Sequence, residues 1–455
     1  MALRPAVPPN ANTARQLLNL PAGLRLLSTE SYSGPAQIPW RPTVALDEWV
    51  QKEARPVSLR QLTYYGRTLT ESRLITSANY VRTELPVRLA HRLREMQKLP
   101  YAVLQNQHLL HVYDLYYKAF DRFRKVHEIR TLDDNDRFCK TLRETLKDHL
   151  TVIPRLAMGV LEVQGRMKAE ATDKFMVTML RSRISRRVIA EQHLSLSETF
   201  HEPWHFPDAN HSQHDPNQEE VGEILLRCNA KEIVERCAEV TRKLMLEQHG
   251  PSCSVPEVKI KGHFQATFPY ILSHVEYMIG ELLRNSMQAM LEQPQYKDNK
   301  PPPIEVLICE TGQQVLFRIC DRGGGIPKEI LPHLWSFSKG PRKDLRLQNL
   351  NRVPKLAATL QEVQVDHGDA GKHFSSPSAH IPHHGPDNSL SSLTSRPPNL
   401  RLGVGLPMSR IYAGYWAGSL EIHSLEGYGV DAFLQISKLG NKNEQLTTRA
   451  NMDSI

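Results

Sequence analysis

The stretch Glu281–Ala289 reads ELLRNSMQA, and it lies in a Leu- and Met-rich segment whose apolar spacing predicts a helix from about Ile271 to Leu291. Glu281 and Asn285 are four residues apart, so on a helix they project from one face, one turn above the other. A carboxylate and a carboxamide placed in this way can orient a nucleophile and hold Mg²⁺ through oxygen ligands. The plainer alternative is an exposed glutamate beside an unremarkable asparagine. Asparagine is nevertheless unusual inside such a helix, because it competes with the helix backbone for hydrogen bonds.

Two glycine-rich motifs follow further along the chain. Asp321–Pro327 (DRGGGIP) comes directly after the β-rich run Val315–Cys320. An aspartate at the end of a strand can accept a hydrogen bond from an exocyclic amine such as that of adenine, and glycines let the backbone approach a ligand closely. Gly403–Ser409 (GVGLPMS) leads into a predicted helix, whose free N–H groups and positive dipole end suit a phosphate. Either motif alone would favour a plain turn, but the three motifs together predict an ATP site.

The second half of the chain has the pattern of an α/β layer domain, which we expect over residues 255–440. Strands are expected at Val258–Lys261, Ile304–Cys309, Val315–Cys320, Leu420–His423 and Val430–Ile436. Helices are expected at 271–291 and after Gly405. A long insertion at 338–402 separates the second and third motifs. Segments of this length are usually functional lids or disordered, and we expect both here.

The first half of the chain, residues 55–248, is strongly helical in pattern. Four segments carry apolar residues at helical spacing, and they start at Pro86, Leu109, Leu142 and about Lys174. Pro86 is expected at the first position of its helix, where proline is tolerated. Four long amphipathic helices predict a four-helix bundle, so the fold class is α+β.

Composition and the N-terminal segment narrow the class of protein. Residues 1–29 contain three arginines and no acidic residue, which is typical of a mitochondrial transit peptide whose end is uncertain; an ordinary disordered terminus is the alternative. The 455 residues contain no apolar run of the roughly 18 to 20 residues that a membrane-spanning helix requires, which excludes a transmembrane receptor. The net charge is +8, but the basic residues alternate with acidic ones along the chain and aromatic residues are not interleaved with them. No nucleic-acid partner is therefore expected.

The three motifs, in this order, are similar to those of the ATPase/kinase superfamily of gyrase, heat-shock chaperones, histidine kinases and mismatch-repair proteins. Further stretches narrow the resemblance: Glu84–His91 (ELPVRLAH), Arg183–Ser185 followed by Gln192 and His193, and Gly405–Tyr412 (GLPMSRIY). These resemble the mitochondrial 2-oxo acid dehydrogenase kinases over about residues 55–437, apart from two inserts. The resemblance implies a histidine-kinase-like α/β sandwich that binds ATP and follows the four-helix bundle.

The resemblance also implies an activity, partners and a location. It implies a serine kinase of the mitochondrial matrix that phosphorylates and inactivates the decarboxylating component of pyruvate dehydrogenase, or alternatively of branched-chain 2-oxo acid dehydrogenase. The bundle would dock the lipoyl domain of the dihydrolipoyl acyltransferase core, and the kinase would form a homodimer through its C-terminal sheet. Tyr277 and the DRGGG wording resemble the branched-chain kinases, whereas Gln192 and His193 resemble the pyruvate dehydrogenase kinases. Pyruvate dehydrogenase is favoured as the commoner target.

Residue roles follow from the same resemblance. Glu281 would be the general base for the substrate serine, Asn285 the Mg²⁺ ligand and Asp321 the adenine acceptor. His193 would orient Glu281, with a structural histidine of the core as the alternative. The other residues implied at the nucleotide are Arg284, Gly323, Gly325, Gly403, Gly405 and Leu406. The chain departs from the family pattern at four positions, with Arg284 for lysine, Gln288 for arginine, Arg401 for glycine and Val430 for threonine.

Two other classes of function remain open at this stage. Val126–Leu132 (VHEIRTL) resembles the phosphoacceptor box of two-component histidine kinases, so His127 would accept the phosphoryl group in a histidine autokinase. Leu132 and the acidic pair that follows it depart from that box. A non-catalytic ATP-sensing module is the second alternative. Glu281 argues against this module, because binding alone needs no base.

Overall fold

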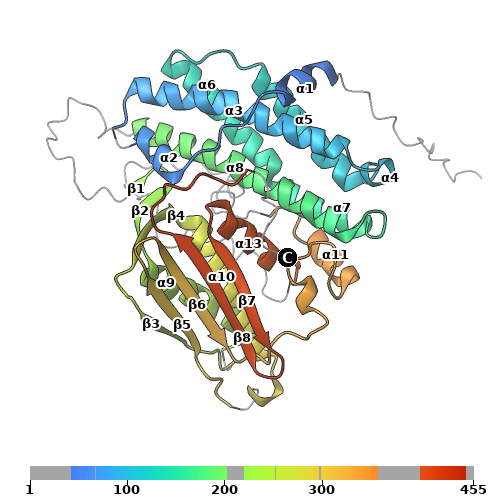
Figure 1. Cartoon of the computed structure of the whole chain (residues 1–455), viewed down its shortest axis with the longest axis vertical. Coiled ribbons are helices and arrows are strands. Elements are labelled where there is room, and N and C mark those ends of the chain that lie inside the picture. The colour runs from blue at the N-terminus through green and yellow to red at the C-terminus, as the bar shows by residue number, and fades with distance from the viewer. Residues whose placement is uncertain are drawn as a thin grey trace, which may run out of the picture. The chain divides into compact units, whose positions relative to one another are not determined.

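The computed structural model describes residues 43–66, 68–201, 220–251, 253–296, 299–356 and 400–446. The expected transit peptide at 1–29 and residues 357–399 of the expected lid lie outside the described residues. The described residues from Val44 onward belong to one compact unit, which has a helical half and an α/β half (Figure 1). None of the described helices is long and apolar enough to span a bilayer.

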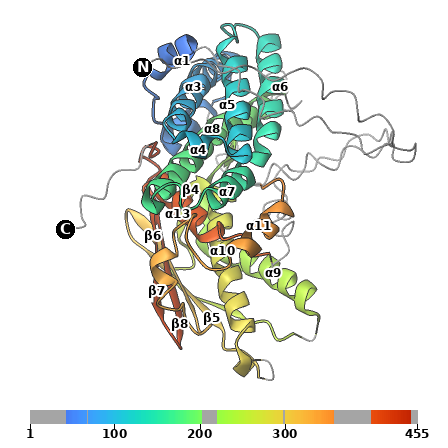
Figure 2. The same cartoon turned by 90° about the vertical axis from the view of Figure 1, so that its right-hand side faces the viewer.

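The helical half consists of long helices packed side by side (Figures 1 and 2). Helix α3 packs against α5, α6 and α8, and α6 also packs against α8. The apolar faces meet in one core, in which Leu93, Tyr116 and Met179 are completely buried. The helices are α1 (Thr43–Val50), α2 (Leu59–Gly66), α3 (Glu71–Gln97), α4 (Tyr101–Leu104), α5 (Gln107–Arg124), α6 (Leu132–Asp148), α7 (Val152–Glu162) and α8 (Ala169–His201).

Helix α3 begins earlier than the sequence led us to expect. Its N-cap is Thr70, whose side chain accepts a hydrogen bond from the backbone N–H of Arg73, and Pro86 lies inside the helix. The expectation that Pro86 starts the helix is therefore wrong. A proline inside a helix costs about 3 kcal/mol. The buried face upstream of it, which includes Leu74 and Val81, offsets that cost.

A buried ionic network joins the C-terminal segment to the helical half. Glu444 accepts hydrogen bonds from the Arg88 guanidinium at 2.8 Å, from the backbone N–H of Val57 at 3.1 Å and from the Tyr415 hydroxyl. Arg88 also contacts Glu84 at 3.3 Å. Since these charges are paired inside the protein, the ELPVRLAH stretch serves structure at this point.

The α/β half is a five-stranded sheet covered by helices on one face (Figures 1 and 2). The strand order is β3-β5-β6-β8-β7; β3 and β5 are parallel and the other pairs are antiparallel. Helices α9, α10 and α13 lie on the covered face. The elements are β3 (Val258–Gly262), β5 (Ile304–Glu310), β6 (Gln314–Asp321), β7 (Ser419–Leu425), β8 (Gly429–Ser437), α9 (Ala230–His249), α10 (Leu272–Leu291) and α13 (Gly405–Tyr415). All five strands that we expected are therefore present.

A small second sheet, β1-β2-β4, changes the expected boundary between the halves. Its strands are β1 (Glu220–Val221), β2 (Ile224–Asn229) and β4 (Thr267–Ile271). Strand β2 pairs with β4, and α9 packs against α10, so both β2 and α9 belong to the α/β half. Residues 224–248, which we expected in the helical domain, therefore pack with the α/β half. Helix α11 (Lys343–Asn351), from the expected insertion, packs against α7.

Candidate active site

The N-terminus of α13 lies against the Glu281 carboxylate. Glu281 is 2% exposed on α10, and a Cβ on Gly405, the first residue of α13, would overlap its Oε2 atom. A larger residue there would require the carboxylate to move. Val404 precedes the helix and makes no side-chain cap hydrogen bond, so the first N–H groups of α13 are not capped by it. The first and third sequence motifs therefore meet in space.

Arg284 lies one turn after Glu281 on the same face of α10. Its Nη1 atom is 3.6 Å from Glu281 Oε1, and both side chains are 3% exposed. The two side chains form a buried ion pair within α10. The sequence led us to expect Arg284 at the nucleotide; in the structure it contacts the expected base.

The second motif is bound to the same helix through Asp321, which ends β6. The Ser286 hydroxyl donates to Asp321 Oδ2 at 2.7 Å, and the backbone N–H of Gly323 donates to Oδ1 at 2.9 Å. Burial raises the pKa of Asp321, and the hydrogen bond from Ser286 opposes that rise. Two donors thus fix the orientation of this carboxylate. Sequence analysis missed Ser286, although it follows Asn285 directly, because only the packing of α10 on β6 brings it to Asp321.

Asn285 differs from its neighbours on α10, because it is exposed whereas Glu281, Arg284 and Ser286 are buried. Its amide oxygen is therefore available to a ligand. Among the described residues, no cluster of three or more His, Cys, Asp or Glu side chains could hold a metal. Mg²⁺ is commonly held by one or two protein oxygens together with substrate phosphates, and an exposed amide one turn from Glu281 fits that pattern.

The glycine loops depend on backbone conformations that favour glycine. Gly325 has φ +74°, and a Cβ there would overlap the carbonyl oxygen of Leu425. Gly403 has φ +70°, and a Cβ there would overlap the Arg346 guanidinium. Gly323 lies close to α10, since a Cβ on it would be 2.7 Å from the Cβ of Ala289. Leu406 is partly buried against the core.

Two of the departures from the family pattern have clear positions. Arg401 forms an exposed ion pair with Glu292, the C-cap residue of α10, so it connects the segment just before the third motif to α10. Val430 is the register partner of Asp321 across β8 and β6. It therefore lies beside the expected adenine acceptor.

The structure does not bring His193 to Glu281. His193 is 1% exposed in the helical core, its Nδ1 atom is 3.1 Å from the Ser77 hydroxyl, and its Nε2 atom is 3.0 Å from Asn135 Oδ1. Burial lowers the pKa of His193 to about 3. Because both ring nitrogens are hydrogen-bonded within the helical half, the expectation that His193 orients Glu281 is corrected. It is a structural histidine of the core.

His127, the phosphoacceptor of the histidine-autokinase alternative, is exposed in the connection between α5 and α6. Its neighbour Glu128 forms an ion pair with Arg130 at 2.8 Å, which occupies the carboxylate beside it. His127 therefore lies in a loop and not on a helix, and the acidic residue beside it, Glu128, is paired with Arg130.

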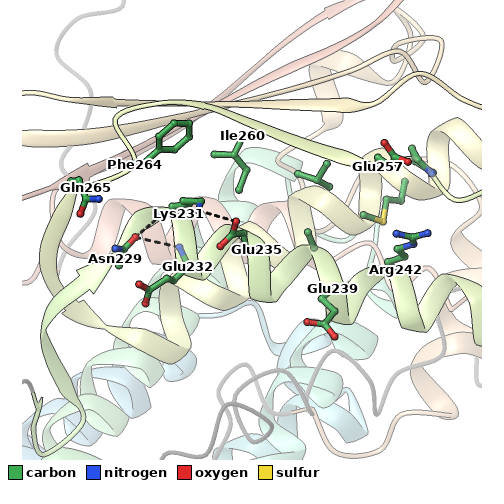
Figure 3. A pocket seen from close by; sticks show the side chains of 14 residues that line it. Asn229, Lys231, Glu232, Glu235, Glu239, Arg242, Glu257, Ile260, Phe264 and Gln265 are labelled. Atoms are coloured by element: carbon green, nitrogen blue, oxygen red, sulfur yellow. Dashed lines mark hydrogen bonds and ion pairs between the residues drawn. The ribbon is translucent and has the colours of Figure 1, made fainter.

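A pocket of about 870 Å³ lies between α9 and β3 (Figure 3), and Met287 of the first motif is one of its lining residues. Glu235, Glu239, Glu257 and Arg242 are among its lining side chains. None of the predicted site residues lines it. The active-site candidate is therefore defined by the convergence of three motifs and not by this pocket.

Comparison with known proteins decides the family. Residues 56–225 match the family model described as mitochondrial branched-chain alpha-ketoacid dehydrogenase kinase. The chain is 31% identical to [Pyruvate dehydrogenase (acetyl-transferring)] kinase 2, mitochondrial, of Saccharomyces cerevisiae, over 92% of this chain and 89% of that protein. The chain belongs to the mitochondrial 2-oxo acid dehydrogenase kinase family.

Other members of this kinase family show similar coverage. [Pyruvate dehydrogenase (acetyl-transferring)] kinase, mitochondrial, of Arabidopsis thaliana is 30% identical over 88% of this chain and 94% of its own length. [Pyruvate dehydrogenase (acetyl-transferring)] kinase isozyme 4, mitochondrial, of Homo sapiens is 26% identical over 92% and 89%. Both halves of the chain are therefore included in the family relationship.

Proposed function

We propose that this chain is an ATP-dependent protein serine kinase that phosphorylates and inactivates the decarboxylating component of pyruvate dehydrogenase in the mitochondrial matrix. The relatives named as mitochondrial pyruvate dehydrogenase kinases support the activity and the substrate. The observation that carries the proposal is the contact of Gly405 with the Glu281 carboxylate, because it joins a base to a phosphate-binding helix terminus. We also propose that the helical half is a four-helix bundle and the α/β half a histidine-kinase-like ATP-binding domain.

Glu281 acts as the general base in this proposal. It accepts the proton of the substrate serine as the serine oxygen forms a bond to the γ-phosphorus of ATP and the bond from that phosphorus to the bridging oxygen of ADP breaks. Arg284, whose Nη1 atom is 3.6 Å from the carboxylate, forms an ion pair with it. Glu281 and Arg284 both lie on α10. They contribute by positioning the hydroxyl oxygen of the substrate serine, and no covalent bond to the enzyme forms.

The nucleotide is held by groups at both ends of the site. Asp321, fixed by Ser286 and Gly323, accepts the exocyclic amine of adenine. The N–H groups at the start of α13, which the Val404 side chain does not cap, bind phosphate. Asn285 would hold Mg²⁺, which when bound neutralises charge on the phosphates.

The C-terminal sheet offers a surface for the proposed homodimer. Its face opposite α9, α10 and α13 carries no helix among the described residues (Figure 2). A shallow depression on the sheet is lined by residues that include Leu316, Phe433 and Gln435. We further propose that the helical half binds the lipoyl domain of the dihydrolipoyl acyltransferase core.

Branched-chain 2-oxo acid dehydrogenase is the second candidate substrate. The description of the family model that matches residues 56–225 favours it, as does Tyr277 one turn before Glu281. Tyr277 is buried against the ring of Tyr412, with 5.3 Å between the ring centroids. Offering both dehydrogenases to the kinase in parallel would separate these substrates.

Single-turnover transfer from ATP to a purified dehydrogenase component tests the proposal. Glu281→Gln should slow transfer by roughly 10² to 10⁴-fold, because it removes a positioned base, while nucleotide binding persists. Glu239→Gln, an exposed position on α9, is the matched control and should leave the rate unchanged. Equal transfer by Glu281→Gln and the unmodified chain would overturn the role of Glu281.

A further inference from the structure

Arg346 on α11 is a buried cation that contacts backbone carbonyls from two separate segments. Arg346 is 7% exposed. Its guanidinium donates hydrogen bonds to the carbonyl oxygens of Phe337 at 2.9 Å, Lys339 at 3.2 Å, Leu402 at 3.4 Å and Gly403 at 3.4 Å. Asn349, one turn further along α11, donates to Arg401 O at 3.1 Å. Helix α11 therefore fastens the segment before it to the glycine loop that leads into α13.

Asp173 on α8 holds the first of these segments from the helical half. Its carboxylate accepts from the backbone N–H groups of Phe337 at 2.9 Å and Ser338 at 3.2 Å. It also accepts from the hydroxyls of Ser336 at 2.6 Å and Ser338 at 3.3 Å. One carboxylate with four donors from a single short turn fixes the position of that turn relative to α8.

The two contacts form a continuous connection between α8 and the expected base. Asp173 binds the turn 336–338, Arg346 joins that turn to Gly403, and Gly405 lies two residues further on against Glu281. Gly403 has a left-handed backbone, and a Cβ there would overlap Arg346, so the loop is shaped around the guanidinium. Helix α11 also packs against α7 of the helical half.

We propose that Asp173 and Arg346 are positioning residues that set the conformation of the loop Gly403–Gly405, and so transmit the position of α8 to the nucleotide site. The inference rests on the proposed function, since it assigns this loop to nucleotide binding. The four hydrogen bonds of Arg346 run to carbonyl oxygens, so it acts by shaping the loop and not as a phosphate ligand. No contact between either side chain and Glu281 is needed for this effect.

The test measures nucleotide affinity and the KM for ATP in the full chain. Arg346→Gln and Asp173→Asn should each raise the dissociation constant of ADP and the KM for ATP by roughly fivefold to fiftyfold, on the scale of hydrogen bonds to charged groups. The value of kcat at saturating ATP should change by less than about twofold, because Glu281 and Arg284 are untouched. Arg346→Lys should restore part of the affinity, since lysine keeps the charge but not the planar set of donors.

Matched controls come from the same part of the structure. Arg352→Gln and Asp344→Asn change exposed charges on or beside α11 and should leave the ADP affinity unchanged. Ser338→Ala removes one hydroxyl donor from Asp173 and should give a smaller loss than Asp173→Asn. It provides a mild variant should a larger substitution unfold the chain, which thermal unfolding would reveal.

A double variant tests whether the contacts act in series. Arg346→Gln combined with Asp173→Asn should weaken ADP binding by less than the product of the single effects, because either change releases the same loop. Folded variants that bind ADP as tightly as the controls, or that lose kcat without a change in KM, would overturn the inference. A different result would separate this inference from the proposed function. If Arg346→Gln weakens ADP binding but the unmodified chain transfers no phosphate to a dehydrogenase, the proposed function fails and the positioning role stands.

Discussion

Two buried clusters of charge, one joining the C-terminal segment to the helical half and one within the α/β half, look alike by burial but differ in what surrounds them. Around Glu444, the partners Arg88, Val57 and Tyr415 are all protein groups packed in a closed interior. Around Glu281, the neighbours are Arg284 and a glycine at a helix terminus, and an exposed asparagine follows one turn later. Buried charge alone therefore does not indicate a functional site. At Glu281 the indication comes from two further features, the backbone of α13 close to the carboxylate and an exposed amide nearby.

Breaking the closed cluster should cost stability without affecting chemistry, and we expect this to be the largest effect. Glu444→Ala should lower the free energy of unfolding by about 3 to 5 kcal/mol, since it removes a partner of the buried Arg88 charge. Denaturant titration measures this change. Glu426→Ala, at an exposed turn, should change it by less than about 0.5 kcal/mol. A full loss of activity in the folded fraction of Glu444→Ala would show that the closed cluster is also catalytic.

The open cluster should respond in the opposite way. Gly405→Ala should reduce kcat/KM by roughly 10²-fold, because its Cβ would overlap the Glu281 carboxylate and force the expected base out of position. Gly414→Ala on the same helix is the control, since a Cβ there meets only the end of Arg181 at 3.4 Å. If both variants retained full activity in steady-state assays, the contact between the motifs would have no role in catalysis.

His193 extends the comparison because, like Glu444, it is buried among protein groups only. Its pKa is lowered to about 3, so the unfolded chain, with an ordinary histidine pKa near 6.5, takes up a proton first as the pH falls. Stability is therefore lost between about pH 6.5 and pH 3, and one such histidine accounts for about 2 kcal/mol at pH 5. His193→Gln should make the pH dependence of unfolding shallower by that amount and leave kcat unchanged at neutral pH. A loss of kcat with unchanged pH dependence would return His193 to the catalytic residues.

The smallest expected effect concerns Ser286. Ser286→Ala removes one of the hydrogen-bond donors to Asp321, which should weaken ADP binding by roughly fivefold, about 1 kcal/mol. The pKa of Asp321 should rise further, because this hydrogen bond opposes the effect of burial. Calorimetric titration with ADP measures the affinity. The control is Ser424→Ala, which removes the acceptor of the Ile326 N–H and tests whether losing any hydrogen bond near the motif Asp321–Pro327 weakens ADP binding equally. Equal losses in both variants would count against a specific role for Ser286.

Part of this site could be read from local sequence because its residues lie on one helix or directly follow a strand. The apolar spacing around Glu281 predicts a helix and the run Val315–Cys320 predicts a strand that ends at Asp321; both elements are confirmed, whereas Glu281 is buried on α10 and Asn285 is exposed. The boundary near residue 250 was misplaced because β2 is recognised only through its pairing with β4. The apolar run at Ile224 was the available signal.

The sequence by itself determined the five strands of the larger sheet, the order of the three motifs and the family to which the chain belongs, because periodicity and glycine placement are local properties of the chain. Only the tertiary structure decided that Ser286 fixes Asp321, that Arg346 shapes the loop at Gly403 and that His193 lies in the helical core. These contacts join residues far apart in the chain. They depend on how helices pack on the sheet and on each other, and local periodicity does not encode that register.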